Sequence, residues 1–244
     1  MKTKLSVNVN KVATLRNQRP QLNIPSLIRA AQICLDAGAQ GITVHPRPDQ
    51  RHIRTDDVFE IGELLKKYPQ AEFNIEGNPF IEFMHFIEKV KPTQATLVPD
   101  TPGQATSDHG WDLQANSERL LPVIRRIKDF GVRVSLFMDP KPEHMELAKA
   151  LGADRIELYT EPYAAAFARG EKRAAEPYAA AAVRAYEVGL DVNAGHDLNL
   201  ENLPPFLKQV RHVLEVSIGH ALIGDALEFG LAETVRKYLK ACGH

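Results

Sequence analysis

Residues 36–53 read Asp36-Ala-Gly-Ala-Gln-Gly-Ile-Thr-Val-His-Pro-Arg-Pro-Asp-Gln-Arg-His-Ile53, so a helix end, an apolar strand and a polar segment follow one another. Gly38 permits the left-handed backbone with which many helices end, and the run from 41 to 44 suits a buried strand. Two histidines and two arginines follow, on a backbone that two prolines stiffen. By itself the polar segment is either an anion-binding catalytic rim or a basic surface loop.

Units of this kind recur along the chain. Glycines that end a helical pattern just before a strand are found again at Gly131, Gly152 and Gly189. Apolar runs of strand character, each followed by a helical pattern, span residues 4–9, 41–44, 72–75, 94–98, 133–138, 155–159, 191–194 and 215–218. The alternation predicts one (β/α)₈ TIM-barrel domain over residues 1–244. An open doubly wound sheet is the alternative, although no Gly-x-Gly-x-x-Gly follows the first run.

The segment from residue 161 to 189 is longer than one barrel helix requires. Gly170 and Pro177 divide it, which predicts an extra helix at about residues 162–169. We expect this helix either over the barrel mouth or in an oligomer interface.

Composition limits the classes of partner. The 30 basic and 31 acidic residues nearly cancel, so we expect a small ligand and neither nucleic acid nor a membrane. The two cysteines, Cys34 and Cys242, support neither a disulfide framework nor a cysteine-based zinc site. The N-terminus lacks the apolar core of a signal peptide, and no run approaches the roughly 18 apolar residues of a membrane helix. A cytoplasmic location fits these features.

Polar residues follow nearly every predicted strand. Because parallel strands place their carboxyl ends on one face, these residues should converge there. Loops are polar in general, so an ordinary solvated surface is the alternative. The residues are Asn8, Asn10, Lys11, His45, Arg47, Glu76, Asp100, Thr106, Asp139, Glu157, Thr160, Asn193, His196, Gly219 and His220.

Two of these positions suit acid/base chemistry. Glu76 follows alternating apolar residues, so a partly desolvated mouth would raise its pKa towards the range of a general base. His196 follows Gly195, which allows close backbone approach to a ligand, and an imidazole moves protons near neutral pH. A solvated glutamate and a hydrogen-bonded structural histidine are the alternatives.

Anion binding is predicted at two places, and a third segment is basic. Gly219 and His220 join the last strand to the last helical segment, the place where many barrels bind phosphate on a helix N-terminus. Planar guanidinium groups suit bidentate phosphate contacts, so the segment of Arg47, Arg51 and His52 is a second candidate. Arg16 and Arg19 form a third basic locus. Two facing anion sites suggest a pair of substrates or one bisphosphate.

Eight ordered segments resemble those of the pyridoxine 5'-phosphate synthase family, whose members are (β/α)₈ barrels. Among them are Asn74-Ile-Glu76, Leu97-Val-Pro-Asp100 and Val192-Asn-Ala-Gly-His196. The full set covers residues 6–19, 41–53, 74–76, 97–100, 134–137, 156–160, 192–196 and 218–220. The resemblance therefore extends over nearly the whole chain.

The resemblance implies a reaction and a set of roles. Members condense 3-amino-2-oxopropyl phosphate with 1-deoxy-D-xylulose 5-phosphate, without cofactor or metal, and assemble as homo-octamers built from dimers. His45 and Glu76 would be proton acceptors and His196 a proton donor. Substrate-binding positions would be Asn8 and Arg19 for the amino ketone phosphate, Arg47, His52 and Thr106 for the pentulose phosphate, and Gly219 and His220 for the phosphate kept in the product. Glu157 matches a further active-site carboxylate.

The chain departs from the family pattern at two places. Many members carry Asp-His where this chain has Asn10-Lys11, and a glycine where it has Asp197. The first change preserves hydrogen bonding but alters charge, so Lys11 is a candidate phosphate partner rather than an acid/base group. Asp197, at a substrate-binding position, either orients His196 or points to solvent.

Two rival functions remain open at this stage. In a metal-dependent sugar isomerase, His45, Glu76, Glu157 and His196 would ligate a divalent cation. A non-catalytic barrel would only bind a phosphorylated metabolite. The number of basic groups favours two phosphates over a metal, and a mere binding protein has no use for three acid/base groups.

Overall fold

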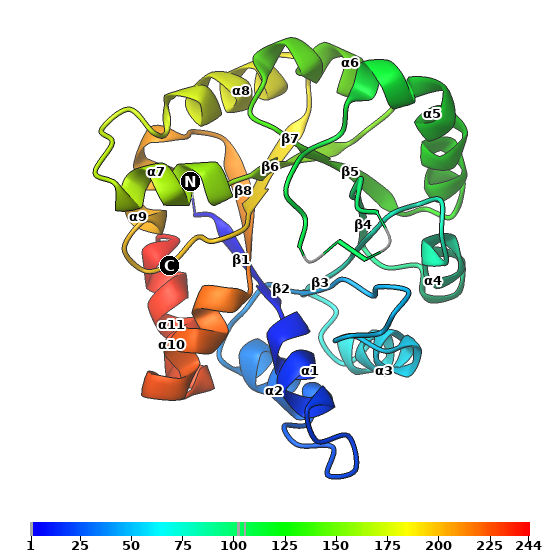
Figure 1. The fold of residues 1–244 in the computed structure, drawn as a ribbon, viewed down its shortest axis with the longest axis vertical. Coiled ribbons are helices and arrows are strands. Elements are labelled where there is room, and N and C mark those ends of the chain that lie inside the picture. Colours follow the sequence, from blue (N-terminus) through cyan, green and yellow to red (C-terminus); the bar gives the residue numbers. More distant parts are fainter. Residues whose placement is uncertain (1, 102, 105) are drawn as a thin grey trace.

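The alternation of strands and helices is present in the computed structural model, which describes residues 2–101, 103–104 and 106–244. Eight parallel strands pair in chain order and close into a barrel, with helices around the outside (Figure 1). The strands are β1 (Lys4–Asn8), β2 (Gly41–Val44), β3 (Glu72–Gly77), β4 (Gln94–Leu97), β5 (Arg133–Met138), β6 (Arg155–Tyr159), β7 (Asp191–Gly195) and β8 (Val213–Ile218). The predicted (β/α)₈ class is confirmed, and strand bounds differ from the prediction by at most two residues.

Helices follow each strand, and three connections carry an additional one. The helices are α1 (Asn10–Asn17), α2 (Leu27–Asp36), α3 (Thr55–Leu65), α4 (Phe83–Val90), α5 (Leu113–Asp129), α6 (Met145–Ala150), α7 (Glu161–Ala168), α8 (Glu176–Glu187), α9 (Leu203–Gln209), α10 (His220–Phe229) and α11 (Leu231–Ala241). A 3₁₀ turn (Pro142–His144) precedes α6. The additional helices are α1, α7 and α10. Helix α7 is the predicted extra helix, and its Tyr163 ring packs on Phe206 of α9 at a centroid distance of 4.9 Å.

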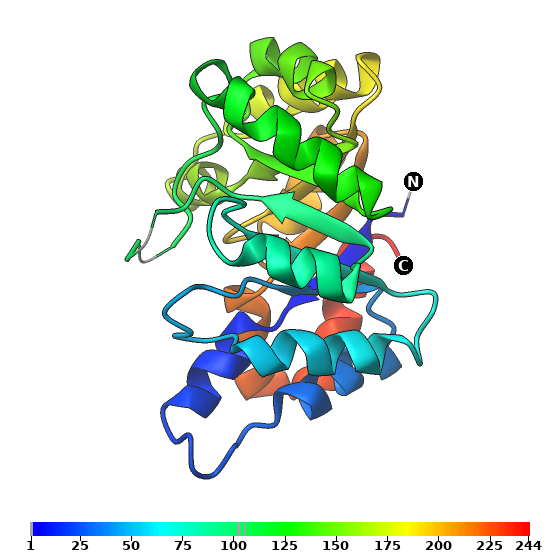
Figure 2. The same ribbon diagram turned by 90° about the vertical axis from the view of Figure 1, so that its right-hand side faces the viewer.

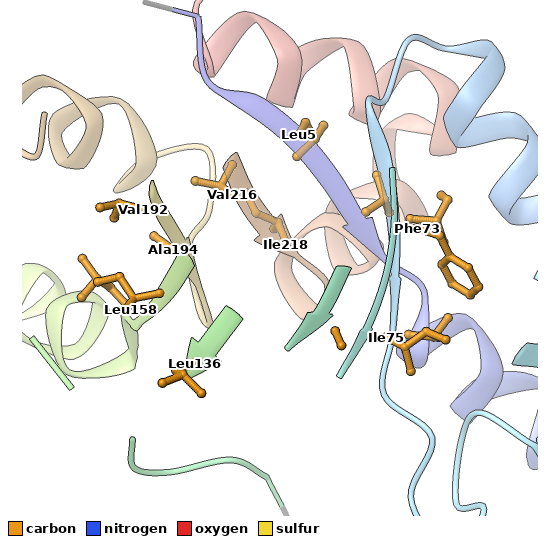
Figure 3. Packing of buried hydrophobic residues seen from close by; sticks show 14 of the residues in the cluster. Leu5, Phe73, Ile75, Leu136, Leu158, Val192, Ala194, Val216 and Ile218 are labelled. Carbon is orange, nitrogen blue, oxygen red and sulfur yellow. The ribbon is translucent and has the colours of Figure 1, made fainter. Parts of the chain in front are cut away.

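Apolar and polar side chains separate onto the two faces of the barrel wall, because successive strand residues point to opposite faces. Figure 3 shows the apolar set, including Leu5, Ile75 and Val216, in the packing between strands and helices. The alternate residues bond to one another across strands inside the barrel. Ser6 Oγ lies 2.7 Å from Thr43 Oγ1, and similar bonds join Asn74 to Thr96 and Asn193 to Glu215.

The barrel interior is thus polar, where many barrels fill it with branched apolar side chains. Arg155 is buried there, with its Nη1 atom 3.7 Å from Glu72 Oε2 and 3.9 Å from Glu215 Oε2. Burial raises the pKa of Glu215 to about 7. The Glu215 carboxyl group therefore holds its proton more tightly than it would in water.

The two ends of the barrel differ in use. Both termini lie on one side of the molecule, opposite the loops that follow the strands (Figure 2). His244 Nε2 lies 2.9 Å from the Thr3 carbonyl oxygen, which ties the two termini together. In the described part of the chain, no helix has the length and apolar character needed to cross a membrane.

Candidate active site

A cavity of about 490 Å³, open to solvent, occupies the mouth formed by the carboxyl ends of the strands. The site residues taken from the family resemblance all line it except Arg19, which is taken up below. Of the other polar residues predicted at the strand ends, Asp100, Asp139, Thr160 and Asn193 do not line it. The lining residues are Asn8, Asn10, Lys11, Thr14, Gln18, His45, Arg47, Arg51, His52, Glu76, Thr106, Ser107, Glu157, His196, Asp197, Ser217, Gly219 and His220.

Two asparagines connect the ends of β1 and β2. Asn8 Oδ1 accepts a hydrogen bond from the Asn10 backbone N–H at 3.0 Å. Asn10 Oδ1 in turn accepts one from the His45 backbone N–H, also at 3.0 Å. The Asn10 amide thus fixes the backbone that carries His45, whereas the neighbouring Lys11 is exposed at the cavity.

His45 and Glu76 form the centre of the site. Both are buried, and His45 Nδ1 lies 3.5 Å from Glu76 Oε2. Burial, together with the charge of Asp100, raises the pKa of Glu76 to about 8. Burial and the Arg47 charge lower the pKa of His45 to about 4. At neutral pH the ligand-free site therefore holds a neutral imidazole beside a protonated carboxyl group.

Arg47 is held in the wall of the cavity by groups that follow β4. Its Nη2 atom donates to Asp100 Oδ2 at 2.5 Å, and its Nη1 atom donates to the Gln104 carbonyl oxygen at 3.1 Å. The guanidinium is buried but reaches the cavity, so it is a preorganised cationic donor. Arg51 Nη1 also donates to the Gln104 carbonyl, and the Arg51 side chain pairs with Asp49.

His52 lies next to this arginine pair, and its imidazole is neutral. Burial, then the neighbouring His45, Arg47, Lys11 and Arg51, lower its pKa to about 3. Its Nδ1 atom accepts a hydrogen bond from the Ile53 backbone N–H at 2.9 Å. The ring proton is therefore on Nε2, which makes His52 a donor suited to an anion.

Glu157 lies deeper in the mouth, against β7. It is 1% exposed, and in the described structure no group donates to its Oε2 atom. Burial, with the charges of Glu76 and Glu215, raises its pKa well above the ordinary value. A Cβ on Gly195 would come within 2.5 Å of Glu157 Oε1, so the glycine makes room for this carboxyl group.

His196 begins the loop after β7 in a left-handed conformation. Its φ is +80°, and that of Asp197 is +57°. The imidazole packs against the rings of Phe137 and Tyr159, at centroid distances of 5.0 and 5.4 Å. Burial lowers the pKa of His196 to about 4, while the Asp197 charge opposes this shift. Asp197 itself is exposed at the cavity.

The β8 end supplies a helix N-terminus. Gly219 precedes α10, and His220 is the first residue of that helix. A Cβ on Gly219 would lie 3.2 Å from the Asn8 side chain and carbonyl oxygen, so a larger residue would press on the end of β1. Backbone N–H groups at such a terminus favour anions.

Three predicted residues differ in how they relate to the cavity. Thr106 is exposed at its rim. Arg19 follows α1, is exposed and does not line the cavity, so its expected contact with a substrate phosphate stays a prediction. Arg16 does not form an anion site: its guanidinium is buried and bonds to both carboxylate oxygens of Asp57, at 2.5 and 2.8 Å. The prediction of a third basic locus at Arg16 is wrong for that reason.

Sequence reasoning missed the roles of two residues near the centre. The sequence marks Asp100 as a polar strand-end residue that closes one of the family-like segments, without a role, and it does not single out Ser107. In the structure Asp100 Oδ2 accepts from both Arg47 and Ser107. Asp100 follows an apolar strand and a proline, as His45 precedes one, and this placement at a strand end was the available signal. Ser107 carried no such signal.

A closed (β/α)₈ barrel that gathers carboxyl, imidazole and guanidinium groups into one mouth cavity has the architecture of a barrel enzyme. Within the residues described, no group of three or more His, Cys, Asp or Glu side chains is arranged to hold a metal ion. Among these residues, the ligand set expected of a metal-dependent sugar isomerase is therefore not assembled.

Comparison with known proteins identifies the family. The family model described as "Pyridoxal phosphate biosynthesis protein PdxJ" matches residues 5–244, so the chain belongs to this family. The pyridoxine 5'-phosphate synthase of Albidiferax ferrireducens is 55% identical over 246 residues, covering 98% of this chain and 97% of that protein. The protein of the same name from Porphyromonas gingivalis is 51% identical, covering 97% of each. The resemblance seen in the sequence is confirmed.

Solved structures support the fold alone. A tryptophan synthase structure from M. tuberculosis aligns with a TM-score of 0.66 at 10% identity, covering 99% of this chain and 93% of that one. A structure from Aquifex aeolicus VF5 aligns with a TM-score of 0.67 at 13% identity and the same coverage.

Proposed function

We propose that this protein is a pyridoxine 5'-phosphate synthase. It condenses 3-amino-2-oxopropyl phosphate with 1-deoxy-D-xylulose 5-phosphate and releases pyridoxine 5'-phosphate, inorganic phosphate and water. Membership of the PdxJ family and relatives of that name at 51–55% identity support the assignment. Because it joins two substrates and expels phosphate, we place it among the transferases.

One observation of the site carries the proposal. The same cavity combines two anion-binding loci with the acid/base groups His45 and Glu76. Arg47 and His52 lie on the β2 side of β1, and Gly219 with the N-terminus of α10 lies on its β8 side. Two phosphorylated substrates would thereby be held with their carbonyl and amine groups over His45 and Glu76. Such positioning converts a bimolecular condensation into a reaction of bound groups.

The reaction requires repeated proton transfer and no redox step. With a pKa of about 8, Glu76 can accept and return protons near neutral pH, because general acid/base catalysis is most effective when the pKa lies close to the pH of the reaction. His45 is neutral at pH 7 and can accept a proton. His196 acts as the donor, and the negative charge of two bound phosphates raises its pKa above the value of about 4 that burial gives it.

The remaining cavity residues bind substrate. Asn8 and Arg19 contact the amino ketone phosphate, and Arg47, His52 and Thr106 hold the pentulose phosphate. Gly219 and His220 hold the phosphate kept in the product, with Asp197 at the same rim. Asn10, Lys11 and Glu157 complete the site. No cofactor or metal is required, and the protein is a cytoplasmic homo-oligomer, an octamer built from dimers.

Two substitutions test the assignment. Glu76→Gln and His45→Asn each remove a proton acceptor while preserving size, so each should lower the rate of product formation by about 10²-fold or more. Binding of inorganic phosphate, measured by calorimetry, should survive in both variants. Glu63→Gln, at a carboxylate exposed on α3, is the matched control and should keep full activity. A fully active double variant would refute the proposed roles.

A further inference from the structure

Asp100 occupies a central position that the proposed mechanism leaves without a role. It follows β4 and is 4% exposed. Its Oδ2 atom accepts from Arg47 Nη2 at 2.5 Å and from Ser107 Oγ at 2.8 Å, and lies 3.6 Å from His45 Nε2. Its main-chain oxygen accepts from Asn78 at 2.8 Å. One carboxylate thus touches the anion-binding arginine and approaches the acid/base histidine.

The other carboxylate oxygen is unusual. Asp100 Oδ1 is buried, and no described residue donates a hydrogen bond to it. An unsatisfied buried acceptor is destabilising, so its retention calls for an explanation in function. If the carboxylate turns when a ligand enters the cavity, Oδ1 can accept a hydrogen bond that it lacks in the described structure.

The His45 ring lies between two carboxyl groups of different character. Glu76 faces Nδ1 at 3.5 Å, and Asp100 faces Nε2 at 3.6 Å. A neutral imidazole carries one N–H and one bare nitrogen. Asp100 Oδ2 already accepts hydrogen bonds from Arg47 and Ser107, so the Asp100 carboxylate acts as an acceptor and attracts the N–H of the imidazole to Nε2. Glu76 holds its own proton at neutral pH, so it favours the bare nitrogen.

We propose that Asp100 is a positioning residue: it fixes His45 in the tautomer with the proton on Nε2 and Nδ1 turned to Glu76, and it holds Arg47 until a substrate phosphate takes over the guanidinium. This inference rests on the proposed function for its kinetic consequences. Its structural content, the tautomer and the competition at Arg47, does not depend on the reaction.

The two tasks predict opposite effects of Asp100→Asn on binding and turnover. The amide keeps the size of the side chain but lacks the charge that competes with phosphate for Arg47. Affinity for inorganic phosphate should therefore increase. Without the fixed tautomer, kcat should fall by about 10²-fold, the lower range of what a positioned proton transfer contributes. A residue that only stabilised the fold would weaken binding and turnover together.

The pH profile gives a further readout. The Asp100 charge raises the pKa of both Glu76 and His45, so its removal should shift the rising limb of kcat/KM to lower pH. The other charged or titratable groups that face this pair are unchanged in the variant. They are Arg47, Arg51 and His52 after β2, Glu157 on β6, His196 after β7 and Glu215 on β8.

The experiment uses the full-length protein with three variants. Asp100→Asn is compared with Asp100→Glu, which restores the charge and should recover part of kcat. Asp49→Asn is the matched control, because Asp49 also pairs with an arginine of this loop but is exposed, and its kcat should match wild type. Circular dichroism and thermal melts establish that each variant is folded.

Nitrogen-15 NMR of labelled histidine separates this inference from the proposed function. In the ligand-free wild type, His45 Nδ1 should resonate as an unprotonated nitrogen, assigned by its loss in His45→Asn, and Asp100→Asn should mix the tautomers. An inactive wild type with that tautomer refutes the proposed function and leaves the inference standing. Wild-type kcat in Asp100→Asn, an unchanged tautomer, or parallel losses of phosphate binding and kcat would each overturn the inference.

Discussion

Glu76 Oε2 lies 3.5 Å from His45 Nδ1, and burial moves the pKa values of the two groups in opposite directions. The pKa of the carboxyl group is raised to about 8, and the pKa of the imidazole is lowered to about 4. Each shift has the same cause, since a desolvated site disfavours the charged form of either group. Both groups are therefore uncharged at neutral pH: the carboxyl group is protonated, and the imidazole is neutral.

Stability should fall with rising pH because of Glu76. Its folded pKa of about 8 exceeds the ordinary 4.5, so its contribution is complete below 4.5 and is lost as pH rises through about 8. His45 and His196 have lowered pKa values, so the change in stability that they cause is complete above about pH 6.5. From pH 6.5 to 8 Glu76 should account for roughly 1–2 kcal/mol. In urea melts, the free energy of unfolding of Glu76→Gln should decline between pH 6.5 and 8 by that much less than the free energy of wild type or Glu63→Gln. An equal decline with pH in all three proteins would contradict the assignment.

Gly195→Ala should disturb the site without unfolding the barrel. The new Cβ would lie 2.5 Å from Glu157 Oε1, so the carboxyl group must move. We expect a cost of about 1–3 kcal/mol in the free energy of unfolding and a clear loss of kcat. Gly224→Ala in α10 is the control, because nothing lies within 4 Å of its added Cβ. That variant should be as stable as wild type or more so, and a fully active Gly195→Ala enzyme would show that Glu157 is free to move.

Lys11→Met should weaken phosphate binding. The lysine is exposed at the cavity and is near enough to lower the pKa of His52. Loss of one charge-assisted contact should raise the Kd for inorganic phosphate about tenfold, which is about 1.4 kcal/mol. Lys172→Met, at an exposed lysine outside the mouth, should leave the Kd unchanged. If the two variants bind phosphate equally in titration calorimetry, Lys11 is not a phosphate partner.

Arg155→Met should be strongly destabilising. The guanidinium is buried between Glu72 and Glu215, and its removal leaves Glu215 without an ion-pair partner among the described residues inside the barrel, whereas Glu72 keeps Lys4 and Arg133. Breaking such a pair typically costs about 3–5 kcal/mol. Arg126→Met removes an exposed pair with Glu88 and should cost less than about 1 kcal/mol in the same denaturant series. Similar losses in both variants would mean that the interior network is not held by Arg155.

The strands and most of the site were predictable because their signals are local. Glycines such as Gly38 mark helix ends, apolar runs mark strands, and parallel strands carry residues such as His45 and Glu76 to one mouth. These features depend on a few neighbouring residues. The fold therefore followed from the pattern, even though pairing joins residues far apart in sequence.

Pairing between distant side chains was not predictable. Arg16 bonds to Asp57, 41 positions away, and Arg47 bonds to Asp100, 53 positions away. From the sequence, each arginine could be taken as available to donate hydrogen bonds to an anionic ligand, because no neighbouring residue shows which carboxylate it contacts after folding. The polar interior around Arg155 has the same origin, since it depends on contacts across several strands.

Incubation of the purified protein with both phosphorylated substrates tests the central claim most directly. Pyridoxine 5'-phosphate is followed by absorbance and mass, and inorganic phosphate is measured in the same samples. The account predicts that both products appear in equal molar amounts, and that neither appears when one substrate is omitted or in Glu76→Gln at comparable enzyme concentration. Absence of pyridoxine 5'-phosphate with the folded, phosphate-binding wild type would contradict it.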